Sequence, residues 1–380
     1  MELKKIKDIA VLGIGDITGS ALTAVFWFYL ASQIEPEHYG EIHWFLGIAG
    51  IFSSIALFGS LNTLTVYTAK NIQIQSTLYV ISLSASIVLS LIVIIFFPSF
   101  YTIDIGLILI AYVINTLAIG DILGRKQYST HSKYILTQKG LTLGLGLLFF
   151  YLFGYEGIIF ALALSYIFFL KRIFSVFREM KVHFKLVKQK IRFITNNYLV
   201  FLTGAIGSGQ IDKIIVAPLL GFAMLGNYNL ALQAISIMMI FSSISYKYLL
   251  PQDATKTKNK NFKMIVILLS IIIALVGIFI GPMLVENYFT KYTDAKLAIQ
   301  IMSLAIIPGT MSLIFQSEFL GNEKSKPVLI VNSVAVITLT ISMIILGLNF
   351  GIIGLGISLV MANSSKVLTF LFFKNRLRYE

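Results

Sequence analysis

Charged side chains are rare in the long apolar stretches of this sequence, and several of them fall on two polar stripes. Asp16, Ser20 and Thr23 recur at helical spacing in the first stretch, so they share one face of a helix. Gln210 and Lys213 share a face in a later stretch in the same way. A buried carboxylate can carry a coupling ion, and a buried ammonium can pair with an anionic substrate. The two stripes therefore predict a polar site among apolar helices.

Asp212 directly precedes Lys213, and this adjacency shapes the prediction for the second stripe. Neighbouring side chains on a helix point about 100° apart, so these two do not face each other. If both are ionised, at least one needs another partner, which a wet cavity or an anionic substrate provides. Alternatively, the stripes pack helices together and one charge reaches toward the membrane interface along its own apolar stem. The candidate substrate-cavity residues are Asp16, Ser20, Thr23, Gln210, Asp212 and Lys213.

Four further charged residues stand near the ends of apolar stretches and are candidates for gating or ion coupling. Asp121 and Arg125 are one helical turn apart at the end of the fourth expected span, where we expect a surface ion pair. Glu318 lies at the corresponding end of the tenth span, and Lys366 lies on the inner part of the twelfth. We expect Lys366 to reach cytoplasmic headgroups rather than substrate.

The sequence carries no motif for catalysis or for a resident cofactor. It has no phosphate-binding loop, no dinucleotide signature and no His-Glu-x-x-His metal helix; its four histidines are scattered, and cysteine is absent. We therefore expect no catalytic residue, no metal and no cofactor, and a chain that is not an enzyme. Energy for transport would come from a proton or sodium gradient, or from the gradient of the substrate. A membrane-embedded transferase and a non-transporting scaffold stay open as alternatives.

The elements that must position these residues are membrane-spanning helices. Of the 380 residues, 57% are hydrophobic and 12% charged, and the mean hydropathy is +0.86, whereas soluble domains carry about 25% charged residues. A span takes about 20 apolar residues, so the chain accommodates twelve spans joined by short loops. The expected fold is an all-α integral membrane protein with spans near 8–31, 43–67, 76–97, 103–122, 134–153, 157–171, 196–219, 226–248, 263–285, 297–317, 326–348 and 351–373.

The lysine and arginine residues indicate how these spans are oriented. With the N-terminus in the cytoplasm, all 30 of them fall at cytoplasmic loops or ends except Lys213, Lys291 and Lys296. This asymmetry is the positive-inside pattern of multispan proteins. The net charge of +13 then reflects orientation and headgroup contacts, so we expect no nucleic-acid partner. The prediction is a multi-pass protein of the cytoplasmic cell membrane with both termini in the cytoplasm.

The two halves of the chain resemble each other, which predicts an internal repeat of six plus six spans. Six is even, so both halves enter from the same side and the repeat is parallel. Two similar lobes around a central site are the architecture of alternating access. We expect an N-lobe at 1–180, a basic cytoplasmic linker at 181–195 and a C-lobe at 196–380. The matches are Leu123-Gly124 with Leu320-Gly321 and Phe153-Gly154 with Phe350-Gly351, both at an offset of 197 residues, and, earlier in each half, Tyr39-Gly40 with Leu225-Gly226.

Short motifs along the whole chain resemble the polysaccharide-biosynthesis or O-antigen-type flippases. The stretch 210–213 (Gln-Ile-Asp-Lys) is similar to the family's Asp-Arg/Lys pair in the seventh span, and 225–231 is similar to its Gly-x-Tyr-x-x-Ala entry to the eighth. The stretch 35–40 resembles its short outer turn between the first two spans, and 352–356 resembles its start of the twelfth. This family belongs to the multidrug/oligosaccharidyl-lipid/polysaccharide (MOP) exporter superfamily.

The resemblance implies a V-shaped, MATE-like arrangement of two six-helix lobes around a central cavity. Asp212 and Lys213 take the place of the family's charged pair, with Lys213 a partner for pyrophosphate. The implied function is a flippase that moves lipid-linked oligosaccharide, carried on polyprenyl pyrophosphate, across the cytoplasmic membrane by alternating access. The implied partners are this glycolipid, membrane lipids and glycan-assembly enzymes, and we expect a monomer. The alternative is a cation-coupled multidrug or metabolite antiporter in which Asp16 is the coupling carboxylate.

Overall fold

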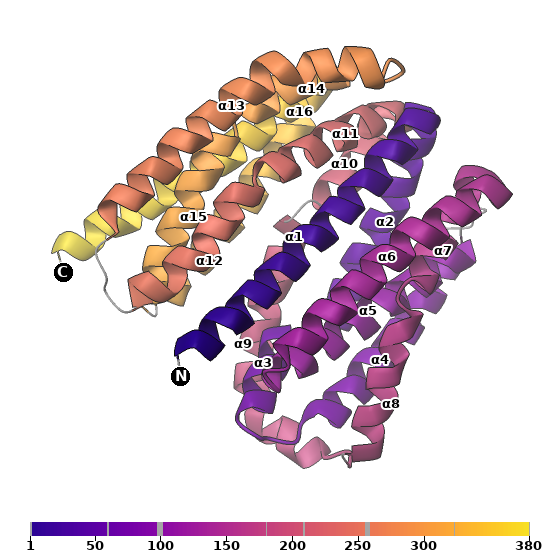
Figure 1. Cartoon of the computed structure of the whole chain (residues 1–380), viewed down its shortest axis with the longest axis vertical. Coiled ribbons are helices and arrows are strands. Elements are labelled where there is room, and N and C mark those ends of the chain that lie inside the picture. The colour runs from indigo at the N-terminus through magenta and orange to yellow at the C-terminus, as the bar shows by residue number, and fades with distance from the viewer. Residues whose placement is uncertain are drawn as a thin grey trace. The chain divides into compact units, whose positions relative to one another are not determined.

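The computed structural model describes residues 2–58, 61–96, 102–179, 181–207, 210–254, 259–322 and 324–379. Helices account for 91% of the residues, and the described part of the chain contains no strand (Figure 1). Helices are expected here because a chain inside lipid must pair its backbone N–H and C=O groups internally. The elements are α1 (Glu2–Gln33), α2 (Pro36–Ala56), α3 (Leu61–Ala69), α4 (Gln75–Phe96), α5 (Thr102–Gly124), α6 (Tyr128–Phe153), η1 (Gly154–Gly157), α7 (Ile158–Leu164), η2 (Ile167–Phe169), α8 (Leu170–Glu179), α9 (Phe184–Gly207), α10 (Ile211–Leu220), α11 (Phe222–Met238), α12 (Ile240–Ala254), α13 (Lys260–Tyr288), α14 (Ala295–Ser303), α15 (Ile306–Gly321) and α16 (Ser325–Tyr379).

Many of these helices have the length and composition of membrane spans. Six stretches within the described residues are long and apolar enough to cross a membrane, and three bent helix pairs would raise the number to nine. The bent pairs are α2 with α3, α11 with α12, and α14 with α15. Large apolar side chains lie on the surface of these helices, among them Ile95 and Phe279, which are 70% and 69% exposed. Such a surface suits lipid rather than water, and the chain is a multi-pass membrane protein.

Two of the six stretches are far longer than one crossing, and each is broken at a glycine. Tyr128–Glu179 has 52 residues and Lys326–Asn375 has 50, whereas one span needs about 20. Gly154 and Gly351 interrupt them with φ angles of 68° and 55°, in the left-handed region that glycine adopts without a steric penalty. These are the two glycines that the offset of 197 residues aligns. Both halves of the chain therefore use the same backbone device at matching points.

The chain divides into two compact units. The first unit comprises Met1–Trp27 and Phe45–Ala205, and the second comprises Phe28–Trp44 and Ile206–Glu380. The turn between α1 and α2 thus belongs to the second unit, whereas most of α9 belongs to the first. Compact units and sequence repeats need not share boundaries. The expected lobes at 1–180 and 196–380, and the linker at 181–195, stay a prediction.

In the first unit, α5 is the central helix and packs against α3, α4, α6, α7 and α8. Glycines allow the closest approaches between helices. A Cβ added to Gly120 or Gly124 of α5 would meet side chains of α3. Likewise, a Cβ added to Gly15 or Gly19 of α1 would press on side chains of α6. Small residues at helix crossings are the usual way in which apolar helices associate in lipid.

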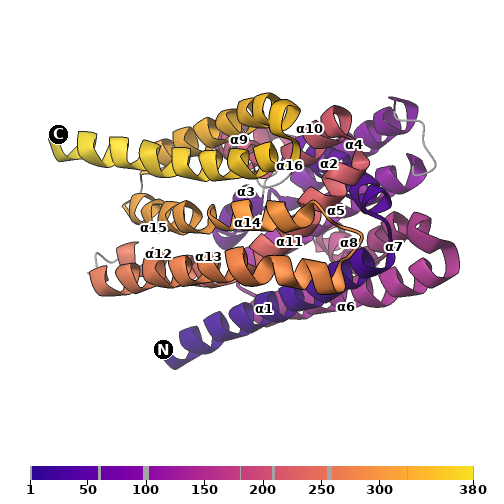
Figure 2. The same cartoon turned by 90° about the horizontal axis from the view of Figure 1, so that it is seen from above.

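In the second unit, α14 packs against α11, α13 and α16, and α15 packs against α12, α13 and α16 (Figure 1, Figure 2). The start of α2 meets the start of α11 at a pair of glycines. Gly40 lies against the backbone carbonyl of Phe222, and Gly226 lies against the carbonyl of Pro36. Both glycines and both carbonyls are separated by the same number of residues along the chain. The contact is therefore reciprocal, as expected where two sequence repeats meet about a local two-fold axis.

Candidate functional site

The first turn of α10, in the second unit, brings together the polar residues of the second stripe. Gln210 is the N-cap residue of α10, and Asp212 and Lys213 follow it within the first turn. The helix ends at Leu220, where Gly221 adopts a φ of 87° and lets the chain turn into α11. The first turn of this short helix therefore carries one acid and one base, and Gly221 ends the helix two turns later.

The carboxylate of Asp212 is buried, and both of its oxygens accept hydrogen bonds from other protein groups. The residue is only 2% exposed. One carboxylate oxygen accepts a hydrogen bond from the backbone N–H of Lys213 at 2.8 Å. The other accepts from the hydroxyl of Tyr228 on α11 at 3.2 Å. Asp212 thus joins α10 to α11, and two hydrogen bonds compensate part of the cost of burying a charged group.

The ammonium group of Lys213, in contrast, has no hydrogen-bond acceptor among the described residues. The side chain is half-buried, yet no carboxylate or other hydrogen-bond acceptor pairs with its Nζ in the part of the chain that the structure describes. Its charge acts on the imidazole of His43, a buried residue near the start of α2. The neighbouring Asp212 offsets part of this charge through space but makes no hydrogen bond to the ammonium group. A half-buried ammonium group without a bonded acceptor favours the binding of an anion.

Gln210 lies one turn before Lys213 on the same face of the helix. Its Oε1 is buried and accepts no hydrogen bond from any described residue. The positive end of the α10 dipole adds to the charge of Lys213 at this point. Together, an unpaired ammonium, an unpaired amide oxygen and a helix N-terminus suit a ligand that carries both anionic oxygens and hydroxyl groups.

The first stripe lies on α1 in the first unit, next to the helix face that packs against α6. Gly15 and Gly19 form the contact with α6, whereas Asp16 is half-buried and Ser20 is exposed. The hydroxyl of Thr23 donates to the carbonyl of Gly19 at 2.9 Å, so it is engaged within its own helix. On α1, therefore, the glycines pack against the neighbouring helix, whereas the polar residues of the stripe lie beside this contact. Whether the two stripes line one cavity stays a prediction.

Asp121 and Arg125 do form the expected pair, but it is not at the surface. Asp121 is fully buried and takes the Nε of Arg125 at 3.1 Å and two nitrogens of Arg172 at 2.5 and 2.7 Å. Arg125 also donates to Glu179 at 2.7 Å. Burial lowers the pKa of Arg125, but these carboxylates raise it more, so it lies above its ordinary value. The expectation of a surface pair is wrong because α8 covers this end of α5 and supplies Arg172.

Glu318 lies in a matching cluster in the second unit. Its carboxylate accepts from Lys263 of α13 and from Lys374 of α16, both at 3.0 Å. Lys263 also bonds to the buried Asp253 at 2.7 Å, and Asp253 accepts from Ser317 at 2.5 Å. Asp121 and Glu318 are related by the offset of 197 residues. Both halves therefore carry a carboxylate at the end of the equivalent helix, held by two cationic groups.

The structure also shows polar residues that sequence reasoning did not select. Arg172 and Lys263 complete the two ionic clusters. Arg172 is 51 residues from Asp121 in the sequence and Lys263 is 55 residues from Glu318, so no local spacing indicates these contacts. Lys139 of α6 is also new; it is half-buried, as is the sequence-predicted Lys366, and no carboxylate pairs with either among the described residues. No group of three or more His, Asp or Glu side chains that could hold a metal occurs in the same part of the chain.

Comparison with solved structures places this geometry in a known fold. The chain has the fold of the MOP-superfamily transporters. It is similar to an inward-facing multidrug resistance MATE family transporter of that superfamily, with a TM-score of 0.69, 14% identity and coverage of 95% of this chain and 94% of the other. It is also similar to the lipid II flippase MurJ in an inward closed conformation, with a TM-score of 0.76, 13% identity and coverage of 96% and 87%.

A third structure, MATE in a bent conformation, has a TM-score of 0.59 and 15% identity, and the match covers 98% of this chain and 95% of the other. No protein-family model matches the sequence, and no curated protein matches it. At these identities the comparisons define the fold, and the function must be argued from the site.

Proposed function

We propose that this protein is a flippase that moves a lipid-linked oligosaccharide across the cytoplasmic membrane by alternating access. The substrate would be a sugar chain on polyprenyl pyrophosphate, moved without covalent change, so the protein would not be an enzyme. The fold supports transport, because the similar structures include both a lipid II flippase and multidrug transporters. Residues on α10 support the choice between them.

The observation that carries this proposal is the unpaired Lys213. A pyrophosphate offers anionic oxygens to the ammonium group, and sugar hydroxyls can donate to the free Oε1 of Gln210. A cationic drug would instead be repelled by Lys213. Asp212 offsets part of this charge, but its carboxylate oxygens accept from Tyr228 and from a backbone N–H, so the ammonium group keeps its own N–H donors for a ligand. The site on α10 therefore favours an anionic substrate.

The proposed topology has twelve crossings with both termini in the cytoplasm. Each of the two stretches of about 50 residues that break at Gly154 or Gly351 has the length of two crossings. The segments α9 and α10 would form the remaining span. In this arrangement the protein works as a monomer beside glycan-assembly enzymes that supply its substrate.

Binding of the substrate tests the proposal directly. We would measure binding of a radiolabelled polyprenyl-pyrophosphate oligosaccharide to the purified protein in lipid nanodiscs. Lys213→Ala should weaken binding by roughly tenfold or more, because a charge-assisted hydrogen bond is lost, and Lys213→Arg should retain most of it. Lys133→Ala, at an exposed position of α6, is the matched control. Unchanged binding by Lys213→Ala would show that this residue does not hold the substrate.

A cation-coupled antiporter is the second candidate, and Asp16 is the observation that favours it. This carboxylate is half-buried on α1, beside the face that packs on α6. In proteoliposomes, an antiporter would expel a small organic cation when a proton or sodium gradient is imposed, and Asp16→Asn would abolish that efflux. Efflux of this kind, without binding of the glycolipid, would favour the antiporter over the flippase.

A further inference from the structure

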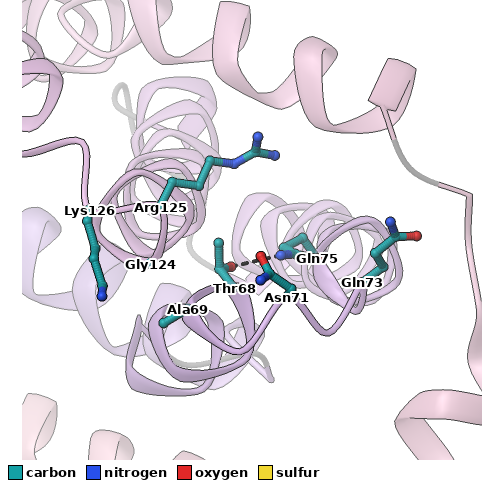
Figure 3. Close-up of a pocket in the computed structure, with 8 residues that line it drawn as sticks. All are labelled: Thr68, Ala69, Asn71, Gln73, Gln75, Gly124, Arg125 and Lys126. Atoms are coloured by element: carbon teal, nitrogen blue, oxygen red, sulfur yellow. Dashed lines mark hydrogen bonds between the residues drawn. The ribbon is translucent and has the colours of Figure 1, made fainter.

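A polar cavity of about 520 Å³ lies in the first unit, where α3 and α5 end and α4 and α6 begin (Figure 3). All of its lining residues belong to the first unit, whereas the site on α10 belongs to the second. No acidic side chain is among the residues that line it. Those residues are Thr68, Ala69, Asn71, Gln73, Gln75, Gly124, Arg125 and Lys126.

Two unusual backbone conformations occur at this cavity. Asn71 and Lys126 have φ angles of 55° and 57°, and they are the only residues other than glycine with positive φ in the described part of the chain. Asparagine tolerates this conformation, whereas it is costly for lysine. Each residue belongs to a turn closed by a backbone hydrogen bond, from Asn71 to Thr68 and from Lys126 to Leu123. Backbone strain of this kind concentrates at functional sites.

The cavity carries several hydrogen-bond donors that bond to no other residue in the described part of the chain. Arg125 uses two of its N–H groups on Asp121 and Glu179, which leaves three of the five that a guanidinium carries. The side chains of Lys126, Asn71 and Gln73 are exposed at the mouth of the cavity and make no hydrogen bond with other described residues. Figure 3 shows the side chains of Arg125 and Lys126 leaving the same turn in different directions, with Gln73 beyond Thr68 and Asn71.

Thr68 and Gln75 are buried at the base of the cavity and are joined by a hydrogen bond. The Nε2 of Gln75 donates to the hydroxyl of Thr68 at 2.9 Å, and both residues are buried. This bond joins the end of α3 to the start of α4, and Asn71 lies beside it (Figure 3). The turn that carries Asn71 is thereby held near Arg125 and Lys126, so one small ligand could contact both turns.

The balance of charge indicates the kind of ligand. Asp121 and Glu179 offset the charge of Arg125, but no described carboxylate pairs with Lys126, so the cavity is net positive. A phosphate group supplies several strong acceptor oxygens and negative charge, and it matches arginine and lysine donors well. We propose that this cavity binds a phosphate group, held by Lys126, Arg125 and Asn71, which bridges the α3–α4 and α5–α6 turns. The proposal does not depend on the transport function.

Two sources of this group can be separated by the probe that is added. We would measure the unfolding temperature of the full chain in detergent with inorganic phosphate, against sodium chloride at equal ionic strength. In parallel, phosphatidic acid would be added in mixed micelles, against diacylglycerol with the same acyl chains. A ligand that binds only the folded state raises the unfolding temperature. A rise with inorganic phosphate assigns a site for free phosphate; a rise with phosphatidic acid alone assigns a lipid headgroup site.

Lys126→Asn is the decisive variant, because asparagine removes the charge and suits the positive φ. Without a probe it should be at least as stable as the wild type. With the probe that stabilises the wild type, its apparent affinity should fall by roughly tenfold or more. Lys133→Asn, an exposed lysine that does not line the cavity, should respond like the wild type. No rise in the wild type with either probe, or an equal rise in Lys126→Asn, would overturn the proposal.

Discussion

At the scale of single residues, adjacent charges on α10 have different roles. Asp212 is buried and bound by Tyr228 and a backbone N–H, whereas Lys213 is left without an acceptor among the described residues. The sequence indicated that the two side chains cannot face each other, since they are neighbours on a helix. It could not show which of the two would be satisfied, because the partner comes from α11. The unsatisfied one is the better candidate for binding substrate.

Tyr228→Phe should lower the free energy of unfolding by about 1–3 kcal/mol. The phenol hydroxyl donates to Asp212 inside the protein, and its removal leaves a buried carboxylate oxygen without a donor. Chemical unfolding in detergent measures the change. Tyr198→Phe is the matched control, because that hydroxyl donates to the carbonyl of Ile55 in a more exposed setting. Equal losses in the two variants would contradict the role given to Tyr228.

At the scale of helices, ionic clusters and glycine contacts fix how neighbours meet. Asp121 ties α5 to α8 through Arg172, and Glu318 ties α15 to α13 and α16. A buried ion pair adds little net stability, but removing one of its partners is strongly destabilising. The clusters therefore specify which helices pack together at these ends.

The cluster at Asp121 makes a prediction about paired substitutions. Arg172→Gln should destabilise the protein by up to about 3–5 kcal/mol, because Asp121 is fully buried and loses its closest cation. Asp121→Asn combined with Arg172→Gln should recover much of this loss, since no charge is then left unpaired. A double-mutant cycle on the unfolding free energy tests the coupling. Additive losses would show that the two residues do not depend on each other.

The reciprocal glycine contact makes a second prediction. Gly226→Ala should destabilise the protein by about 1–3 kcal/mol or more, because its Cβ would press on the backbone carbonyl of Pro36. Gly144→Ala of α6 is the control, since nothing lies within 4 Å of its added Cβ. That change should be neutral or slightly stabilising, because alanine favours a helix over glycine. Thermal unfolding of the two variants in one detergent gives the comparison, and similar behaviour would count against the contact.

Much of the helical framework could be predicted from the sequence, but its contacts could not. Apolar runs and their breaks gave the helices, and the offset of 197 residues aligned Gly154 with Gly351, which share a positive φ. Arg172 and the Gly40–Gly226 contact depend on segments far apart in the chain. Spacing rules describe only neighbours on one helix, so these partners needed the three-dimensional fold.

At the scale of the whole molecule, the proposed twelve-crossing topology is open to a clean test, because the chain has no cysteine. Single cysteines at Glu37 and Lys188, both exposed, can be labelled with a membrane-impermeant maleimide. In intact cells, Glu37→Cys should react and Lys188→Cys should not, because positive residues mark the cytoplasmic side. Both should react after permeabilisation. Labelling of Lys188→Cys from outside would contradict the orientation.

Translocation itself is the measurement that tests the central claim most directly. A fluorescent polyprenyl-pyrophosphate oligosaccharide would be incorporated into proteoliposomes, and its appearance in the opposite leaflet would be followed with an impermeant quencher. We predict translocation that depends on the protein and falls by about tenfold or more in Lys213→Ala, while Lys133→Ala keeps the wild-type rate. Absence of translocation by folded wild-type protein, or an undiminished rate in Lys213→Ala, would contradict the account.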